Sequence, residues 1–188
     1  MNNLYDLYVI LQLNKKSQNE IHNFFISNYG ITKDKLLTNL HVTIYYGRRL
    51  LKGLRLDDQY VSFKCNVSET RFMTMTPGGE NPRKGIIPSQ RTIGVRLTRR
   101  NICIPRILEI RRRIYKLEPK FEKRQNTTDW KNSFGSREYQ PHISLLRPHN
   151  GLENDLREVG KNFRKKIKYI NFSKVITNYK ERKIDTEI

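Results

Sequence analysis

The apolar and polar positions in the first quarter of the chain predict a strand, a helix and a second strand. Residues 4–13 are rich in aliphatic and aromatic side chains, which is typical of a buried strand. The helix expected next begins at a capping box, Ser17 with Glu20, and ends at Gly30. Residues 40–46 are again apolar and predict the second strand.

The remaining patterns predict further strands of a largely antiparallel sheet and further helices. They indicate strands at 60–75 and 91–97, a helix at 105–117, a strand at 139–146, a helix at 151–159 and one or two strands at 169–179. Proline and glycine dipeptides predict a loop at 77–90. Each half of the chain thus runs strand, helix, strand, strand, which predicts an α+β fold built as a cryptic duplication.

A short motif occurs on the strand after the helix in each half. A histidine is followed two residues later by a hydroxyl side chain, at His41 and Thr43 and again at His142 and Ser144. Successive side chains of a strand point to opposite faces, so the histidine and the hydroxyl of each motif share a face. If the two strands lie near each other around a pseudo-two-fold axis, all four side chains converge on one cleft.

Two imidazoles and two hydroxyls suit the cleavage of a phosphodiester. The unperturbed histidine pKa of ~6.5 lets one imidazole accept a proton from the attacking oxygen while the other donates to the departing oxygen. The hydroxyls can bind the non-bridging phosphate oxygens. A lone histidine on a strand is usually structural, but the repeated context favours catalysis. We therefore predict a phosphodiesterase that needs no metal or other cofactor.

Composition limits the partners and the location of the protein. The 188 residues are enough for one compact domain, 1–188. Thirty-seven Lys and Arg against 18 Asp and Glu give a net charge of +19, which favours a phosphate-rich partner, although much of this charge could be ordinary solvated surface. Without a long apolar run or a secretory signal pattern, we expect an intracellular protein with no membrane contact. Cys65 and Cys103 lack metal-site spacing, and we expect both to be buried and reduced.

The two motifs resemble those of the two-histidine phosphoesterases, the LigT-like superfamily, and the likeness spans most of the chain. The resemblance implies a bilobal fold, with two pseudo-symmetric antiparallel sheet lobes flanked by helices around a central cleft. It also implies metal-independent action on cyclic phosphates or phosphodiesters of nucleotides and RNA.

Within that superfamily the chain is most similar to the phage anti-CBASS phosphodiesterases, through segments 6–9, 39–46 and 138–145. This similarity implies a cyclic di- or trinucleotide substrate, opened at a 3′,5′ bond by the neighbouring 2′-hydroxyl, in the cytoplasm of an infected host cell. The chain departs from the family through its basic loop at 77–90 and a basic C-terminal extension. The sequence does not predict the oligomeric state.

Aromatic and basic residues near the motifs are candidates for substrate binding, with simple packing as the alternative for each. An aromatic ring that stacks on a base contributes roughly 1–3 kcal/mol. Strand parity puts Tyr45 on the face of His41 and turns Tyr46 to the core. The candidate stacking residues are Tyr8, Tyr45, Trp130 and Tyr139, and the candidate phosphate contacts are Arg147, Arg83 and Lys84.

Two other functions stay open on the sequence alone. The first is an RNA-end processing enzyme that opens 2′,3′-cyclic phosphates, which the net charge of +19 mildly favours. The second is an RNA-binding module that kept the fold and lost catalysis, and its binding would depend steeply on salt.

Overall fold

The computed structural model describes residues 5–47, 51–55, 58–75, 92–117, 139–147 and 151–181. The predicted basic loop at 77–90, the stretch around Trp130 and the end of the basic C-terminal extension lie outside these residues. The described strands and helices follow in the order β1 (Tyr5–Leu13), α1 (Lys15–Tyr29), β2 (His41–Gly47), β3 (Gln59–Asn66), β4 (Thr70–Met75), β5 (Thr92–Leu97), α2 (Ile104–Tyr115), β6 (His142–Leu146), α3 (Leu156–Lys166) and β7 (Tyr169–Glu181).

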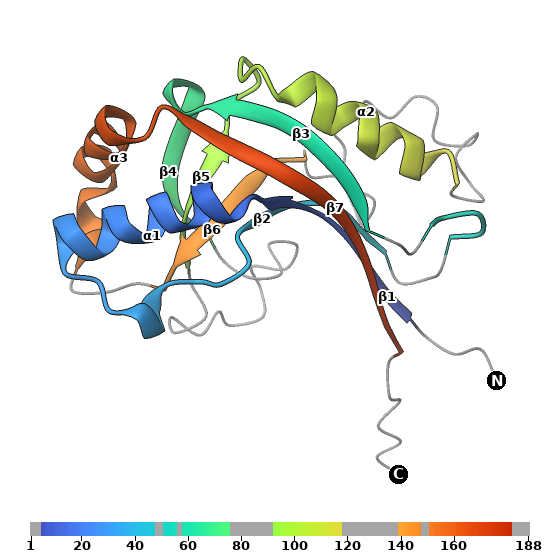
Figure 1. Cartoon of the computed structure of the whole chain (residues 1–188), viewed down its shortest axis with the longest axis horizontal. Helices are drawn as coiled ribbons and strands as arrows, with labels where there is room; N and C mark the ends of the chain where they lie inside the picture. The colour runs from blue at the N-terminus through green and yellow to red at the C-terminus, as the bar shows by residue number, and fades with distance from the viewer. Residues whose placement is uncertain are drawn as a thin grey trace, which may run out of the picture.

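These strands form one antiparallel sheet in the order β3-β7-β1-β2-β6-β5-β4. The prediction of an α+β fold with an antiparallel sheet is confirmed. Figure 1 shows α1 and α3 near each other at one end of the curved sheet and α2 toward the other end. Strands β2 and β6, which carry the two histidine motifs, are neighbours at its centre.

An apolar row crosses the sheet on the face that the helices cover. Its members are register partners on successive strands and are all buried: Phe72, Val95, Ile143, Val42 and Leu11. The Phe72 ring lies 6.5 Å from the Phe25 ring of α1 and 5.0 Å from the Phe163 ring of α3. Because side chains alternate along a strand, the residues on either side of this row face away from the helices.

The same kind of register shift occurs on each side of the β2–β6 pair. Strand β1 shifts against β2 between Val9 and Ile10, and β5 shifts against β6 between Ile93 and Gly94. Each shift leaves one residue of the histidine strand without a register partner, directly after the hydroxyl of the motif. A bulge of this kind bends the strand and reverses its parity beyond that point. The repeat lies within one continuous sheet.

The predicted strand at 60–75 is wrong, because it is two strands at opposite edges of the sheet. A 3-10 turn, Val67–Glu69, separates β3 from β4. Val67 is buried and continues the apolar alternation of β3, so the pattern conceals the turn. The Val67 amide donates to the Lys168 carbonyl, and the Thr70 hydroxyl donates to the Val67 carbonyl, which fixes the change of direction.

The helix ends also differ from the sequence pattern. Asn14, not Ser17, caps α1, because its side chain accepts from the Ser17 amide at 2.8 Å. Ser17 is buried, and its hydroxyl oxygen accepts from the Asn171 amide of β7. Gly30, with φ of 63°, ends the helix as predicted. The predicted helix at 151–159 is a 3-10 turn followed by α3, which runs on to Lys166.

The two cysteines are bonded to each other. Both are buried, as predicted, but Cys65 and Cys103 form a disulfide with Cα atoms 5.0 Å apart, so the expectation of free thiols is wrong. The bond joins the end of β3 to the N-cap residue of α2. Their separation of 38 residues gives no local spacing signal, since only the tertiary fold brings them together.

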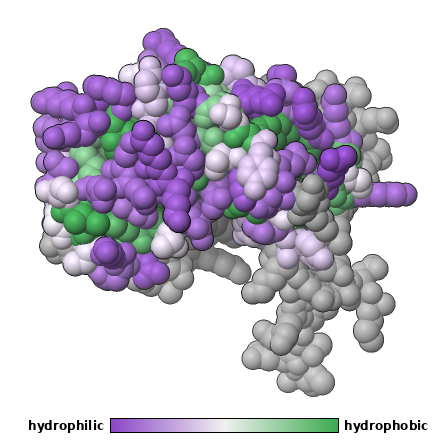
Figure 2. Space-filling model, viewed as in Figure 1, coloured by the Kyte–Doolittle hydropathy of each residue, from purple (hydrophilic) through white to green (hydrophobic). Residues whose placement is uncertain are grey.

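Much of the visible surface is hydrophilic. Figure 2 shows the same side as Figure 1, with polar side chains over most of it and smaller apolar patches between them. Of the helices that the structure describes, none is long and apolar enough to cross a membrane.

Reduction of the Cys65–Cys103 bond should lower the free energy of unfolding. Closing a loop of this length is worth about 2–4 kcal/mol. Urea unfolding followed by circular dichroism, with and without reductant, measures the difference. The double variant Cys65→Ala, Cys103→Ala is the control and should not respond to reductant. Equal unfolding midpoints of the natural chain in both buffers would contradict the prediction.

Candidate active site

The four predicted catalytic side chains lie on the same face of two adjacent strands. Val42 and Ile143 are register partners in the antiparallel β2–β6 pair, and both are fully buried toward the helices. Continuing this antiparallel register by one residue in each direction pairs His41 with Ser144 and Thr43 with His142, and strand alternation puts all four side chains on the other face. Directly opposed residues have Cβ atoms about 4.5–5.5 Å apart. The parity prediction and the proximity of the two motifs therefore both hold in the structure.

The two imidazoles are anchored in the same way. His41 Nδ1 lies 2.8 Å from the Asn39 carbonyl oxygen, and His142 Nδ1 lies 2.8 Å from the Gln140 carbonyl oxygen. A carbonyl oxygen only accepts, so Nδ1 carries the proton in each ring and donates it. Nε2 is then the nitrogen that can exchange a proton with a substrate. Asn39 has φ of 53°, in the left-handed region that asparagine tolerates.

Strand β5 supports the second motif closely. Gly94 is the register partner of Ser144, and a Cβ at Gly94 would collide with the Ile143 carbonyl oxygen and the Met75 side chain. Only glycine lets the two strands approach this far. The Thr92 hydroxyl donates to the Ser144 hydroxyl at 3.4 Å, which orients that side chain on the site face.

Arg96 is a site residue that the sequence reasoning missed. It is the β5 register partner of His142 and lies on the same face of the sheet. Its position could be inferred from the alternation on β5, where Thr92, Gly94 and Arg96 interleave with buried apolar residues. The pattern alone does not predict that β5 pairs with β6, so it does not predict that Arg96 lies beside His142.

The pKa of His142 is lowered from its ordinary value near 6.5. Burial of the ring is the main cause, since it penalises the charged imidazolium, and the nearby charges of His41 and Arg96 lower the pKa further. The hydrogen bond to the Gln140 carbonyl opposes this shift. His142 is therefore biased toward its neutral form, which can accept a proton.

The bulge after Thr43 exchanges the predicted places of two tyrosines. Tyr45 is the partner of Val9, is buried, and packs edge-on against Tyr115 of α2 at 5.5 Å. The prediction that Tyr45 lines the site is wrong, because Ile44 occupies the bulge and reverses the parity after it. Tyr46, expected in the core, is instead the partner of Tyr8 on the site face.

Tyr8 lies on the site face as an aromatic surface. It is 43% exposed, and its ring centroid is 4.4 Å from that of Tyr46. The alternation along β1 puts it on the face of Gln12, which is the register partner of His41. The structure thus brings Tyr8 and Tyr46 to the histidine face as a pair.

Tyr139 is buried and contacts the backbone of β2 at the first motif. It is only 7% exposed, and its hydroxyl donates to the Thr43 carbonyl oxygen at 2.9 Å. The Arg111 guanidinium lies 3.9 Å from the Tyr139 ring and donates to the Ile44 carbonyl oxygen. Tyr139 therefore connects the segment before β6 to the backbone of β2, and the structure does not place its ring on the site face as a stacking surface. Burial raises the pKa of its hydroxyl, which keeps it a donor.

Of the other predicted contacts, only Arg147 lies within the described residues. Arg147 follows β6, is exposed, and has its amide bonded to the Lys35 carbonyl. Its role as a phosphate contact stays a prediction. Trp130, Arg83 and Lys84 lie outside the described residues. His22 is partly buried on α1, and its Nε2 bonds to the Leu37 carbonyl.

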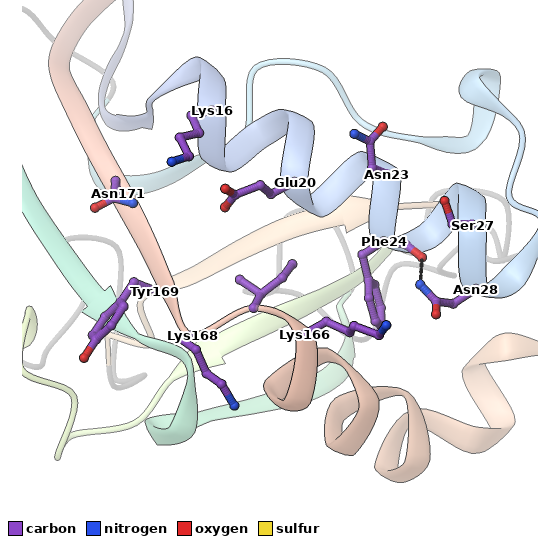
Figure 3. A pocket seen from close by; sticks show the side chains of 11 residues that line it. Lys16, Glu20, Asn23, Phe24, Ser27, Asn28, Lys166, Lys168, Tyr169 and Asn171 are labelled. Atoms are coloured by element: carbon purple, nitrogen blue, oxygen red, sulfur yellow. Dashed lines mark hydrogen bonds between the residues drawn. The ribbon is translucent and has the colours of Figure 1, made fainter.

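A groove lies between α1 and the junction of α3 with β7. Figure 3 shows Lys16 and Glu20 on one wall and Lys166 and Lys168 on the other. Its lining comes from elements that carry neither histidine motif. The groove is therefore separate from the candidate active site. Among the residues that the structure describes, no cluster of three or more His, Cys, Asp or Glu side chains could hold a metal ion.

We expect the His142 imidazole to titrate below 6.5 in a proton NMR titration, and Arg96→Gln to raise that pKa by removing a neighbouring positive charge. Arg157→Gln, on α3, is the control and should leave it unchanged. With a lowered pKa in the folded protein, His142 binds its proton more readily in the unfolded chain. The free energy of unfolding should therefore fall as the pH drops from 6.5 through the pKa of His142 in the folded protein. A His142 pKa at or above 6.5 would overturn the assignment.

Loss of the Tyr139 and Arg111 contacts should destabilise the fold by different amounts. Tyr139→Phe removes one hydrogen bond and should cost about 1 kcal/mol in urea unfolding.

Arg111→Lys keeps the charge but loses the planar fork that reaches the Ile44 carbonyl and the Tyr115 hydroxyl, so it should cost about 2 kcal/mol or more. Arg113→Lys, at an exposed position of α2, is the control. Equal effects of the two arginine changes would contradict this.

No protein-family model matches the chain, and no curated protein matches it significantly either. The functional argument therefore depends on the residues of this chain and on the geometry that they adopt.

Proposed function

We propose that the protein is a metal-independent phosphodiesterase that opens 3′,5′ bonds of cyclic di- or trinucleotides, with His41 and His142 as its acid–base pair. The observation that carries the proposal is the Val42–Ile143 register, with both imidazoles on one face and both Nδ1 atoms anchored at 2.8 Å. Two equivalent imidazoles side by side fit a reaction in which one proton is removed while another is delivered.

In the proposed reaction, neutral His142 acts as the base. Its Nε2 accepts the proton of the ribose 2′-hydroxyl, and the 2′ oxygen attacks the adjacent phosphorus. The bond from phosphorus to the 5′ oxygen breaks, and protonated His41 donates its proton to that leaving oxygen. The product is a linear nucleotide with a 2′,3′-cyclic phosphate. Water can then open this ring to a 3′-phosphate, with the two histidines exchanging roles.

The neighbouring polar groups would stabilise the charge that develops on the phosphate. Thr43 and Ser144 can donate to the non-bridging oxygens, and the bond from Thr92 orients the Ser144 hydroxyl. Arg96, beside His142, adds a fixed positive charge. On the opposite side of the histidines, the Tyr8–Tyr46 pair can stack on a base.

The proposal includes the fold family and the biological setting. The two halves of the sheet around β2–β6 would be the two lobes of a two-histidine phosphoesterase, and the open face of the sheet would be its cleft. Destroying a cyclic nucleotide signal in the cytoplasm of an infected host would evade bacterial CBASS immunity. That compartment is reducing, which would favour reduction of the Cys65–Cys103 bond between β3 and the N-cap residue of α2.

A second candidate is a phosphodiesterase that opens 2′,3′-cyclic phosphates at RNA ends. The net charge of +19 favours it, because a polyanion as long as RNA would use more of the basic surface than a cyclic dinucleotide. Its chemistry would use the same four side chains.

Turnover by purified protein, with chelator present, tests the proposal on cyclic dinucleotides, cyclic trinucleotides and an RNA with a 2′,3′-cyclic end. We expect turnover of the cyclic oligonucleotides, and a loss of about 10²–10⁴-fold in His41→Ala or His142→Ala. Thr43→Ala and Ser144→Ala should lose less. His22→Ala removes another described histidine and should keep activity near that of the natural chain.

Product analysis by chromatography and mass spectrometry separates the candidates. Turnover of the RNA end alone supports the second candidate, and tight RNA binding without turnover of any substrate supports a non-catalytic module. Activity of His142→Ala near that of the natural chain would refute the proposed histidine pair.

A further inference from the structure

Two arginines extend the row of site residues to the edge of the sheet. Arg96 is the register partner of His142, and Arg71 on β4 is the register partner of Arg96. On either side of Arg71, Thr70 and Phe72 are buried toward the helices, so Arg71 lies on the histidine face. From β2 to β4 the row is Thr43, His142, Arg96 and Arg71.

This arginine pair leaves two positive charges next to each other. Like charges directly opposite on adjacent strands destabilise a sheet. Among the described residues, neither guanidinium forms an ion pair or a hydrogen bond. The nearby carboxylate of Glu69 accepts from the Thr98 hydroxyl at 3.1 Å. An anion bound between Arg96 and Arg71 would offset their repulsion.

The equivalent positions on the other side of the site are neutralised. Gln12 is the partner of His41 as Arg96 is of His142, and Lys174 is the partner of Gln12 as Arg71 is of Arg96. Lys174 Nζ lies 3.2 Å from the Asp58 carboxylate and 4.9 Å from the Tyr60 ring centroid. Of these four positions, the two with a cation that has no ion-pair partner in the described part of the chain are therefore on the β5–β4 side. Tyr8 of β1 and Tyr60 of β3 lie on the other side.

The spacing suits a second phosphate of the same substrate. Neighbouring strands are about 4.8 Å apart, so the backbones of Arg96 and Arg71 lie about 5 and 10 Å from that of His142. Both long side chains can reach a phosphate one nucleotide beyond the one held between the histidines. The guanidinium group matches phosphate oxygens with two parallel hydrogen bonds, which gives geometry as well as charge.

We propose that Arg96 and Arg71 bind a second phosphate of the substrate, so that the site selects cyclic oligonucleotides with at least two phosphodiesters over substrates with the scissile one alone. This inference rests on the proposed function, whose site it extends. It also gives the substrate a direction on the sheet. The second phosphate lies toward β4, and a base lies toward Tyr8 and Tyr46.

The test compares a cyclic dinucleotide with a linear dinucleoside monophosphate, which contains one 3′,5′ phosphodiester and no other phosphate. For the cyclic substrate, Arg71→Gln should raise KM about 10- to 100-fold with little change in kcat, since a charge-assisted hydrogen bond to phosphate is lost. For the linear substrate, its kinetics should stay within about twofold of the natural chain. Arg157→Gln removes an equal charge from α3 and should change neither.

Equal losses on the two substrates would overturn the inference, as would a response like that of Arg157→Gln. Equilibrium binding of both ligands to His41→Ala protein, with and without Arg71→Gln, provides a readout that does not need turnover. A loss of binding confined to the cyclic dinucleotide supports the subsite, and no difference between the ligands refutes it. Failure of the natural chain to cleave either substrate refutes the proposed function instead. Thermal unfolding confirms that each variant is folded.

Discussion

The candidate site depends on one buried contact, the pairing of Val42 with Ile143 at the centre of the sheet. Both side chains are fully buried, and they are the single register pair that joins β2 to β6. Beyond this pair, the end of β6 is hydrogen-bonded to the segment before β2. The Leu37 amide donates to the Leu145 carbonyl, and the Arg147 amide donates to the Lys35 carbonyl. A slip of one residue in either strand would turn its histidine toward the helices and expose its apolar side chains, so the hydrophobic core specifies the register of the site.

The support beneath the site is polar as well as apolar. Arg111 is 2% exposed, packs between the rings of Tyr115 and Tyr139, and holds the Ile44 carbonyl at the bulge of β2. Tyr139 holds the Thr43 carbonyl. Burying a guanidinium is costly unless its donors and its charge are satisfied, and here the two aromatic faces, the Ile44 carbonyl and the Tyr115 hydroxyl contribute to that. The same contacts bring the chain before the second motif against the backbone of the first.

Strand parity was enough to predict that His41 and Thr43, and likewise His142 and Ser144, share one face of the sheet, because alternation over three residues does not depend on the rest of the strand. It failed two residues later, at Tyr45 and Tyr46, because a bulge has no signature in composition. Arg96 and Arg71 could not be connected to His142 from the sequence, since strand order decides that contact and the pattern at 60–75 predicts one strand where the structure has β3 and β4. The Cys65–Cys103 bond could not be predicted for the same reason, because the two cysteines are distant in sequence and only the tertiary fold brings them together.

The register shifts of β1 against β2 and of β5 against β6 give the two histidines equivalent backbone surroundings, but the side chains beside them differ in charge. His41 has neutral Gln12 as its neighbour on β1, whereas His142 has Arg96 on β5. Strand β3 continues the sheet beyond β7, and Asp58, the residue before β3, lies against Lys174. Strand β4 is the last described strand on its side, and no described strand lies beyond Arg71 to supply a carboxylate. Burial of the ring is the main cause that lowers the pKa of His142, and the nearby charges of His41 and Arg96 lower it further. The neighbouring strands therefore place a fixed cation beside His142 and a neutral amide beside His41.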